Sequence, residues 1–198
     1  MTASSISSED ARDALAPFGA LQAQPASDWT GDRPLHPSLL RFYEEVGPYG
    51  KHRPHGPEGL EIPTLGNPFW LPPLSGLWAF QAGYRWDGRS GARIPDWQEE
   101  WLVVGDQGGD PFILDEASGQ ILHDRQGRGS WAPLRLFDDL FAMGFALGTI
   151  GRLHEEAGED VYNEDFEVRP EWASELRARL GRRFAAAEAD AIATRLEW

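Results

Sequence analysis

The sequence of 198 residues contains no cysteine and no long apolar run. The missing cysteines exclude disulfides, thiolate zinc sites, iron–sulfur clusters and a cysteine nucleophile. A mean hydropathy of -0.47, with no apolar stretch of about 18 residues, argues against a membrane-spanning helix. Residues 1–13 have neither a positively charged start nor an apolar core, so we expect no secretory signal or transit peptide. These features together predict a cytoplasmic protein.

Basic side chains are scarce, since 18 Lys and Arg stand against 32 Asp and Glu, for a net charge of -14. The negative electrostatic potential of such a chain repels phosphate backbones and anionic lipids, so we expect neither nucleic acid nor a membrane as a partner. A basic protein fits this charge better. Solubility alone is an alternative reason for the same charge.

Recognisable catalytic motifs are also missing, because GxxxxGK[ST], HExxH and GxSxG patterns do not occur. A glycine-rich turn follows residues 101–104, but residues 111–114 after it favour a strand. No helix amino terminus is therefore available there to bind a phosphate. We expect a protein that is not an enzyme, with no catalytic residue and no cofactor.

Carboxylates beside glycines raise the alternative of a hard-cation site. Four of them lie close together in the chain: Asp106, Asp110, Asp115 and Glu116. Aspartate and glycine are also the residues that tight turns require. His52 and His55 lack a third ligand at a diagnostic spacing. We interpret the carboxylates as turn residues and expect no metal, and a metal-assisted hydrolase remains the less favoured alternative.

The apolar pattern predicts a single α+β domain with a mixed, mostly antiparallel sheet, helices packed on it and a C-terminal helical extension. Residues 1–30 are expected to be a poorly ordered lead with a short helical turn from Ser8 to Leu15. Residues 36–46 favour a helix ended by Gly47. Residues 47–76 hold seven prolines and six glycines, which predicts a long loop without central strands.

The rest of the main domain, residues 31–150, supplies the sheet. Aromatic and β-branched content predicts strands at residues 77–86, 101–104, 112–115 and 120–123. A long buried helix is expected from Leu134 to about Glu156, with three glycines on one face: Gly144, Gly148 and Gly151. Because each glycine lowers helix stability by about 1 kcal/mol, a close approach by another element is expected there. Residues 151–198 should form an acidic stretch and two helices on the same domain.

Two surfaces are candidates for binding a partner. Trp86 and Trp97 flank a polar loop, where exposed aromatic side chains would act as interface anchors. The first candidate surface comprises Trp86, Asp87, Asp96, Trp97, Glu99 and Glu100. Residues 155–167 have seven acids in 13 residues and no base, with Tyr162 and Phe166 among them. The second candidate surface there includes Glu155, Glu156, Glu159 and Asp160.

The segment WLVVGDQGGDPFILD, residues 101–115, resembles the SUKH superfamily together with residues 118–121, Trp131 and residues 134–147. Members carry a strand ending in a Gly-Asp turn, a Gly-Asp step into a second strand, a short hairpin and a helix rich in Leu and Phe. Residues 36–47 resemble the early helix of the same domain. The resemblance covers about residues 36–150.

The resemblance implies an α+β fold and non-enzymatic binding proteins, which include bacterial immunity proteins that neutralise toxins and fungal regulators of cell-wall synthesis. The leading hypothesis is therefore an immunity protein that binds and neutralises a basic toxin domain. An intracellular scaffold or regulator of the same fold is the alternative. The proline-rich segment and residues 152–198 depart from a minimal member, so the identity of a toxin does not transfer.

Overall fold

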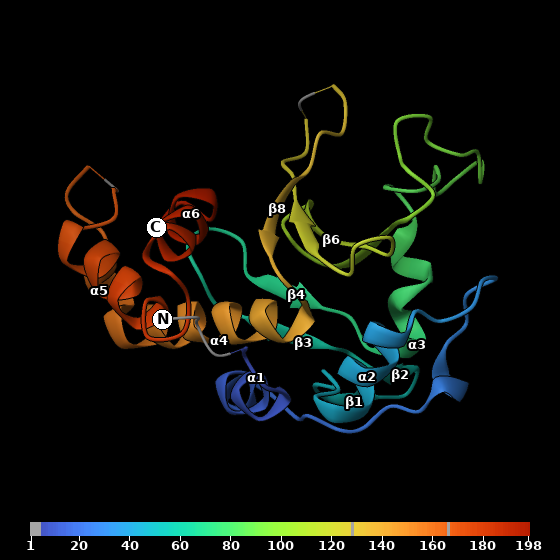
Figure 1. The fold of residues 1–198 in the computed structure, drawn as a ribbon, viewed down its shortest axis with the longest axis horizontal. Coiled ribbons are helices and arrows are strands. Elements are labelled where there is room, and N and C mark those ends of the chain that lie inside the picture. The colour runs from blue at the N-terminus through green and yellow to red at the C-terminus, as the bar shows by residue number, and fades with distance from the viewer. Residues whose placement is uncertain (1–4, 128, 166) are drawn as a thin grey trace.

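Six strands pair in the order β3-β4-β5-β6-β7-β8, antiparallel at every step, and helices cover one face of this sheet (Figure 1). The computed structural model describes residues 5–127, 129–165 and 167–198. The strands are β3 (Leu60–Ile62), β4 (Phe69–Leu71), β5 (Trp101–Gln107), β6 (Asp110–Asp115), β7 (Ile121–His123) and β8 (Leu134–Phe137). A small separate sheet pairs β1 (His52–Arg53) with β2 (Gly56–Pro57). The predicted α+β class is confirmed.

Helix α4, Leu140–Ala157, runs along the sheet and contacts three other helices and the two edge strands of the sheet: α1, α2, α5, β3 and β8. The remaining helices are α1 (Ser8–Leu15), α2 (Pro37–Glu45), α3 (Leu74–Leu77), α5 (Pro170–Leu180) and α6 (Ala186–Arg195). Among the described residues, no helix is long and apolar enough to cross a membrane. Trp198 is buried and its indole Nε1 donates to Thr64 Oγ1 at 3.1 Å. The C-terminal helices therefore pack on the same body as the sheet.

The predicted strands at residues 101–104, 112–115 and 120–123 are confirmed as β5, β6 and β7, but the predicted strand at residues 77–86 is wrong. Helix α3 and a 3₁₀ turn, Ala79–Gln81, occupy that stretch. The buried Gln81 side chain explains the difference, because its amide accepts from Val103 N at 2.9 Å and donates to Val103 O at 2.8 Å. A side-chain amide thus satisfies backbone groups of β5 that an adjacent strand would otherwise bind.

The proline-rich segment does contain strands: β4 lies inside the sheet, so the prediction of no central strand is wrong there, while β3 forms the edge of the sheet. The prolines lie outside the two strands, at Pro63, Pro68 and Pro72. Each strand is three residues long, and β4 pairs with both β3 and β5. Proline excludes a strand only at positions whose N–H the ladder needs, and these prolines fall between those positions.

One helix boundary and the expected order of the N-terminal segment also differ from the prediction. Residues 134–137 form β8, and helix α4 begins only after Asp139, whose carboxylate accepts from Ala142 N at 2.8 Å as an N-cap. The expected poorly ordered lead is corrected as well, because α1 has a capping box at Ser7 and buries Ala11 and Leu15 completely. Helix α1 therefore belongs to the core rather than preceding it.

The three glycines of α4 form the close approach that the sequence predicts. A Cβ at Gly148 would lie 2.5 Å from Ala14 O, and one at Gly151 would lie 2.5 Å from Ile62 Cγ2. For a Cβ at Gly144 the nearest atom would belong to a side chain, Leu15 Cδ1, at 3.2 Å. Helix α1 thus rests directly on the backbone of α4 at Gly148.

Gly148→Ala should destabilise the fold, because the added methyl group would collide with the rigid backbone carbonyl of Ala14. Overpacking of this kind costs about 1–3 kcal/mol. Gly144→Ala is the matched control, since Leu15 can move aside and alanine favours the helix by about 1 kcal/mol. Urea unfolding should place Gly148→Ala about 2 kcal/mol below Gly144→Ala. Equal unfolding free energies for the two variants would contradict the proposed contact.

Candidate functional site

The first candidate surface is built around a second apolar cluster, on residues 84–101 and the sheet. Trp97 is only 1% exposed, with ring centroids of Trp101 and Trp131 at 5.5 and 5.3 Å. Its Nε1 donates to Trp101 O at 3.0 Å. The expectation that Trp97 is an exposed interface anchor is therefore wrong. The loop of residues 84–101 leads away from the sheet and returns to it, and the buried Trp97 side chain holds it against the sheet.

Two of the predicted acids on this loop, Asp87 and Glu99, are satisfied by partners within the loop. Asp87 accepts from Ser90 N and Ser90 Oγ at 2.7 Å each and from Arg89 N at 3.1 Å. These hydrogen bonds, mainly the two from Ser90, hold the pKa of Asp87 below its ordinary value. Glu99 forms ion pairs with both Arg85 and Arg93. Asp87 is thus a turn residue and Glu99 the centre of an arginine cluster.

Three of the six predicted residues remain open to a partner in this region. Trp86 is half-buried, with its ring centroid 5.0 Å from that of Trp78. Asp96 and Glu100 are exposed and form no ion pair with a described residue. The structure therefore keeps Trp86, Asp96 and Glu100 accessible but removes the aromatic anchor Trp97 from the surface.

The second candidate surface begins in the last turn of α4 and continues through residues 158–165 and 167. A 3₁₀ turn, Gly158–Val161, leads into a loop in which Asn163 Oδ1 accepts from Asp165 N and Glu167 N, both at 2.9 Å. Arg169 Nε donates to Tyr162 O at 2.9 Å and closes the loop. Phe166, which the sequence offered as an anchor, lies outside the described residues.

Two of the four acids predicted here are paired and two are not. Glu156 accepts two hydrogen bonds from Arg179, at 2.7 and 3.0 Å, and these hold its pKa below the ordinary value. Asp160 pairs with Arg169 at 3.1 Å. Glu155 and Glu159 are exposed and form no ion pair with a described residue.

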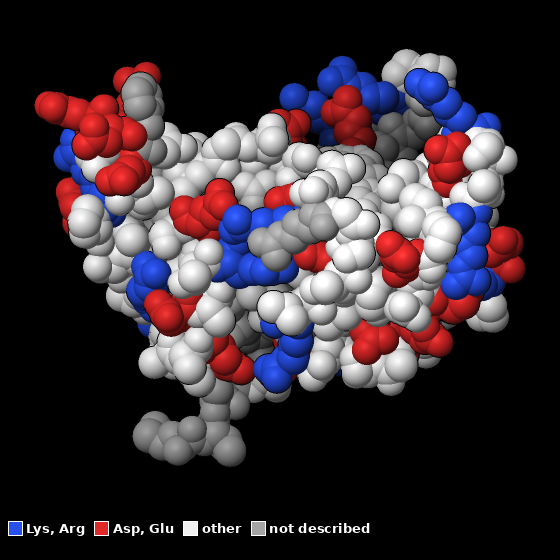
Figure 2. Space-filling view, turned by 90° about the horizontal axis from the view of Figure 1, so that it is seen from above, with Lys and Arg blue, Asp and Glu red and all other residues white. Residues whose placement is uncertain are grey.

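Further along the loop, Glu164 and Asp165 are exposed and equally unpaired among the described residues. Figure 2 shows acidic side chains gathered at the α5 end of the molecule, on the left of that view. We call the four unpaired carboxylates the acidic patch: Glu155, Glu159, Glu164 and Asp165.

Sequence reasoning missed the arginines that neutralise part of this end. Arg177, Arg179, Arg182 and Arg183 lie within seven residues at the end of α5. A basic cluster in a strongly acidic chain was a visible signal, but three of its partners come from α1, α4 and α6 and are remote in sequence: Asp10, Glu156 and Asp190. Only the packing of the three helices brings these charges together.

Two of the carboxylates considered as cation ligands, Asp106 and Asp115, accept from turn amides, and Glu116 pairs with Arg33. Asp106 accepts from Gly109 N at 3.0 Å and from Tyr84 Oη at 3.2 Å, while Asp115 accepts from Ala117 N at 3.2 Å. Asp110 accepts from Gln126 N at 2.8 Å. Among the described residues, no three acidic or histidine side chains gather in a way that could hold a metal ion.

His123 is the most perturbed histidine, buried at the end of β7. Its Nδ1 accepts from Arg195 Nε at 3.0 Å, so the proton of the neutral ring is on Nε2, which has no hydrogen-bond partner among the described residues. Burial, together with the charges of Arg195 and Arg125, lowers the pKa of His123 to about 3. The ring therefore stays neutral at physiological pH and serves the packing of β7 against α6.

Comparison with protein-family models, with curated proteins and with solved structures found no match to this chain. The arguments about function therefore rest on the chain's own residues.

Trp97→Ala should unfold the protein more readily rather than merely weaken binding, because it empties a buried site. Replacing a buried tryptophan by alanine costs about 3–5 kcal/mol. Trp86→Ala is the control, since its ring is half-exposed and less area is lost. Chemical denaturation followed by circular dichroism measures both losses, and similar values for the two variants would contradict the burial of Trp97.

Because of His123, the free energy of unfolding should decrease as the pH is lowered. Its folded pKa of about 3 lies below the ordinary value of 6.5, so only the unfolded chain binds this proton between those values. Linkage then predicts a loss of about 2 kcal/mol in unfolding free energy from pH 7.5 to 5. In His123→Asn, whose amide oxygen replaces Nδ1 as the acceptor, that loss should shrink by the same amount. Identical pH slopes for the two proteins would refute this origin.

Proposed function

We propose that this protein is a non-enzymatic binding module whose acidic patch contacts the basic face of a partner protein. The observation that carries the proposal is the set of exposed carboxylates at the α5 end that no described arginine neutralises. Other acids of the two candidate surfaces, such as Glu99 and Glu156, are already paired with arginines of the same chain. Unpaired charge of one sign on one face is what a partner of the opposite sign recognises.

The patch is also held in shape before any partner arrives. The hydrogen bonds of Asn163 and the contact of Arg169 with Tyr162 O fix the loop that carries it. Trp172 lies beside the patch, half-buried, and its Nε1 donates to Asp160 O at 3.1 Å. Preorganised charge beside aromatic side chains lowers the ordering cost of binding, and aromatic side chains are common interface anchors.

The more specific proposal is an immunity protein that neutralises a basic toxin domain in the cytoplasm. Its support is the resemblance of residues 36–150 to the SUKH superfamily, joined with the net charge of -14. An acidic inhibitor gains association rate against a basic target by electrostatic steering. A regulator of the same fold would use the same patch on a harmless partner.

The test begins with capture of a partner from the native host by the wild-type chain, followed by binding kinetics with the purified partner. Glu159→Lys/Glu164→Lys should slow association at least about tenfold and flatten its salt dependence, because the steering charge is reversed. Asp96→Lys/Glu100→Lys is the matched control, with the same change in net charge on the other candidate surface. Slower association in the control alone would place the interface there and overturn the proposal.

Growth assays separate an immunity protein from a regulator. Expression of the captured partner alone in a bacterial host should arrest growth, and co-expression of the wild-type chain should restore it. The Glu159→Lys/Glu164→Lys variant should restore growth less well than the control variant. A partner that is harmless when expressed alone would refute the immunity role and leave a regulatory one.

A further inference from the structure

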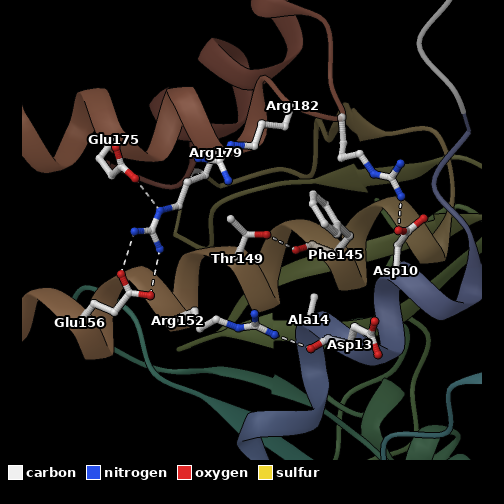
Figure 3. A pocket seen from close by; sticks show the side chains of 11 residues that line it. Asp10, Asp13, Ala14, Phe145, Thr149, Arg152, Glu156, Glu175, Arg179 and Arg182 are labelled. Atoms are coloured by element: carbon white, nitrogen blue, oxygen red, sulfur yellow. Dashed lines mark hydrogen bonds and ion pairs between the residues drawn. The ribbon is translucent and has the colours of Figure 1, made fainter.

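A cavity of about 460 Å³ lies between α1, α4 and the end of α5. This volume falls within the range of pockets that hold small molecules, roughly 300–1,000 Å³. Ala14, Phe145 and Thr149 contribute apolar and hydroxyl surface to its lining, and four arginines from two helical segments complete it. Figure 3 shows these side chains converging on the space between the helices.

Two of the four arginines are committed to carboxylates. Arg179 donates to Glu156 and also to Glu175, the latter at 2.7 Å, and Arg183 is paired with Asp10. In Figure 3 dashed lines join Arg179 to both glutamates. These pairs join α5 to α4 and α1, and their two positive charges compensate two of the three carboxylate charges that they contact.

The other two arginines are not committed in this way. Arg152 donates to the backbone carbonyl of Asp13, and Arg182 forms no side-chain hydrogen bond or ion pair within the described part of the chain. Figure 3 shows the Asp13 carboxylate pointing away from the Arg152 guanidinium. Arg152 and Arg182 thus form no ion pair with a described carboxylate, and the four arginines and four acids that line the cavity sum to zero charge.

The net charge of -14 does not prevent an anion from binding here. At physiological ionic strength charges are screened over about 8 Å, so the distant acids contribute little inside the cavity. A guanidinium acts at contact distance and presents a planar fork of donors that matches carboxylate and phosphate oxygens. The groups that line the cavity therefore decide whether an anion binds there, and the net charge of the whole chain does not.

We propose that this cavity binds a small organic anion, whose oxyanion group pairs with Arg152 and Arg182 and whose apolar part lies against Phe145. Thr149 sharpens the choice of ligand. Its hydroxyl donates to Phe145 O at 2.8 Å, so toward the cavity it presents lone pairs that accept a ligand hydroxyl or amine. Carboxylates and phosphate monoesters share the required oxyanion chemistry. The site is separate from the acidic patch, so the two proposals stand or fall independently.

Isothermal titration calorimetry at fixed ionic strength tests this with phenyl phosphate, benzoate and inorganic phosphate as probes. At least one aromatic anion should bind with a Kd below about 1 mM, a modest affinity for a ligand of this size. Phenyl phosphate should bind more tightly than inorganic phosphate, because only the former has a ring to place against Phe145. The comparison of phenyl phosphate with benzoate separates a phosphate site from a carboxylate site.

Arg182→Gln is the decisive variant, because Arg182 holds no described part of the fold together, and it should weaken binding at least tenfold. Arg89→Gln is the matched control, since it removes the same charge from an exposed loop outside the cavity, and it should bind as the wild type does. The proposal is overturned if neither aromatic anion binds at about 10 mM, well above the expected Kd. It is also overturned if Arg182→Gln binds like the wild type, or if both variants weaken binding equally.

Discussion

The close contact between α1 and α4 at Gly148 is the constraint on which the rest of the structure depends. Helix α4 buries 12 of its 18 residues, against the sheet on one side and helices on the others. Because the missing Cβ lets α1 approach its backbone, α4 is covered along most of its surface. The helix is then held in position by packing.

One stripe of α4 escapes this burial. Thr149, Arg152 and Glu156 recur at helical spacing on the side that faces the end of α5. The stripe supplies two of the charged side chains that line the cavity. Glu156 accepts hydrogen bonds from Arg179, while Arg152 donates to the backbone carbonyl of Asp13. The same packing that buries α4 therefore leaves a polar floor between three helices.

Charge is distributed less evenly than its total suggests. The loop of residues 84–101 neutralises itself through Arg85, Arg93 and Glu99, and Asp87 satisfies turn amides. Exposed ion pairs of this kind add little stability, but they leave little net charge for a partner. Unpaired acids collect on the loop before α5, and unpaired arginines line the neighbouring cavity. One end of the molecule thus carries both kinds of recognition chemistry.

Local chemistry in the sequence determined a good part of this protein. The hairpin of β5 to β7 follows from aromatic and β-branched runs around a turn of residues 116–119, and α2 follows from a proline start and a glycine stop. The three glycines of α4 predicted a close approach because their helical cost needs a packing reason. The turn and the helix ends are set by interactions within a few residues along the chain, while the glycines indicate that another element comes close without showing which one.

Only the tertiary structure decided the remainder, because its deciding partners are remote in sequence. Trp97 reads as a loop residue until Trp131 packs beside it, and residues 77–86 read as a strand until the Gln81 amide binds β5. Glu156 reads as a free acid until Arg179 arrives from another helix. Burial and charge pairing depend on which elements meet, and a linear pattern shows only what each element offers.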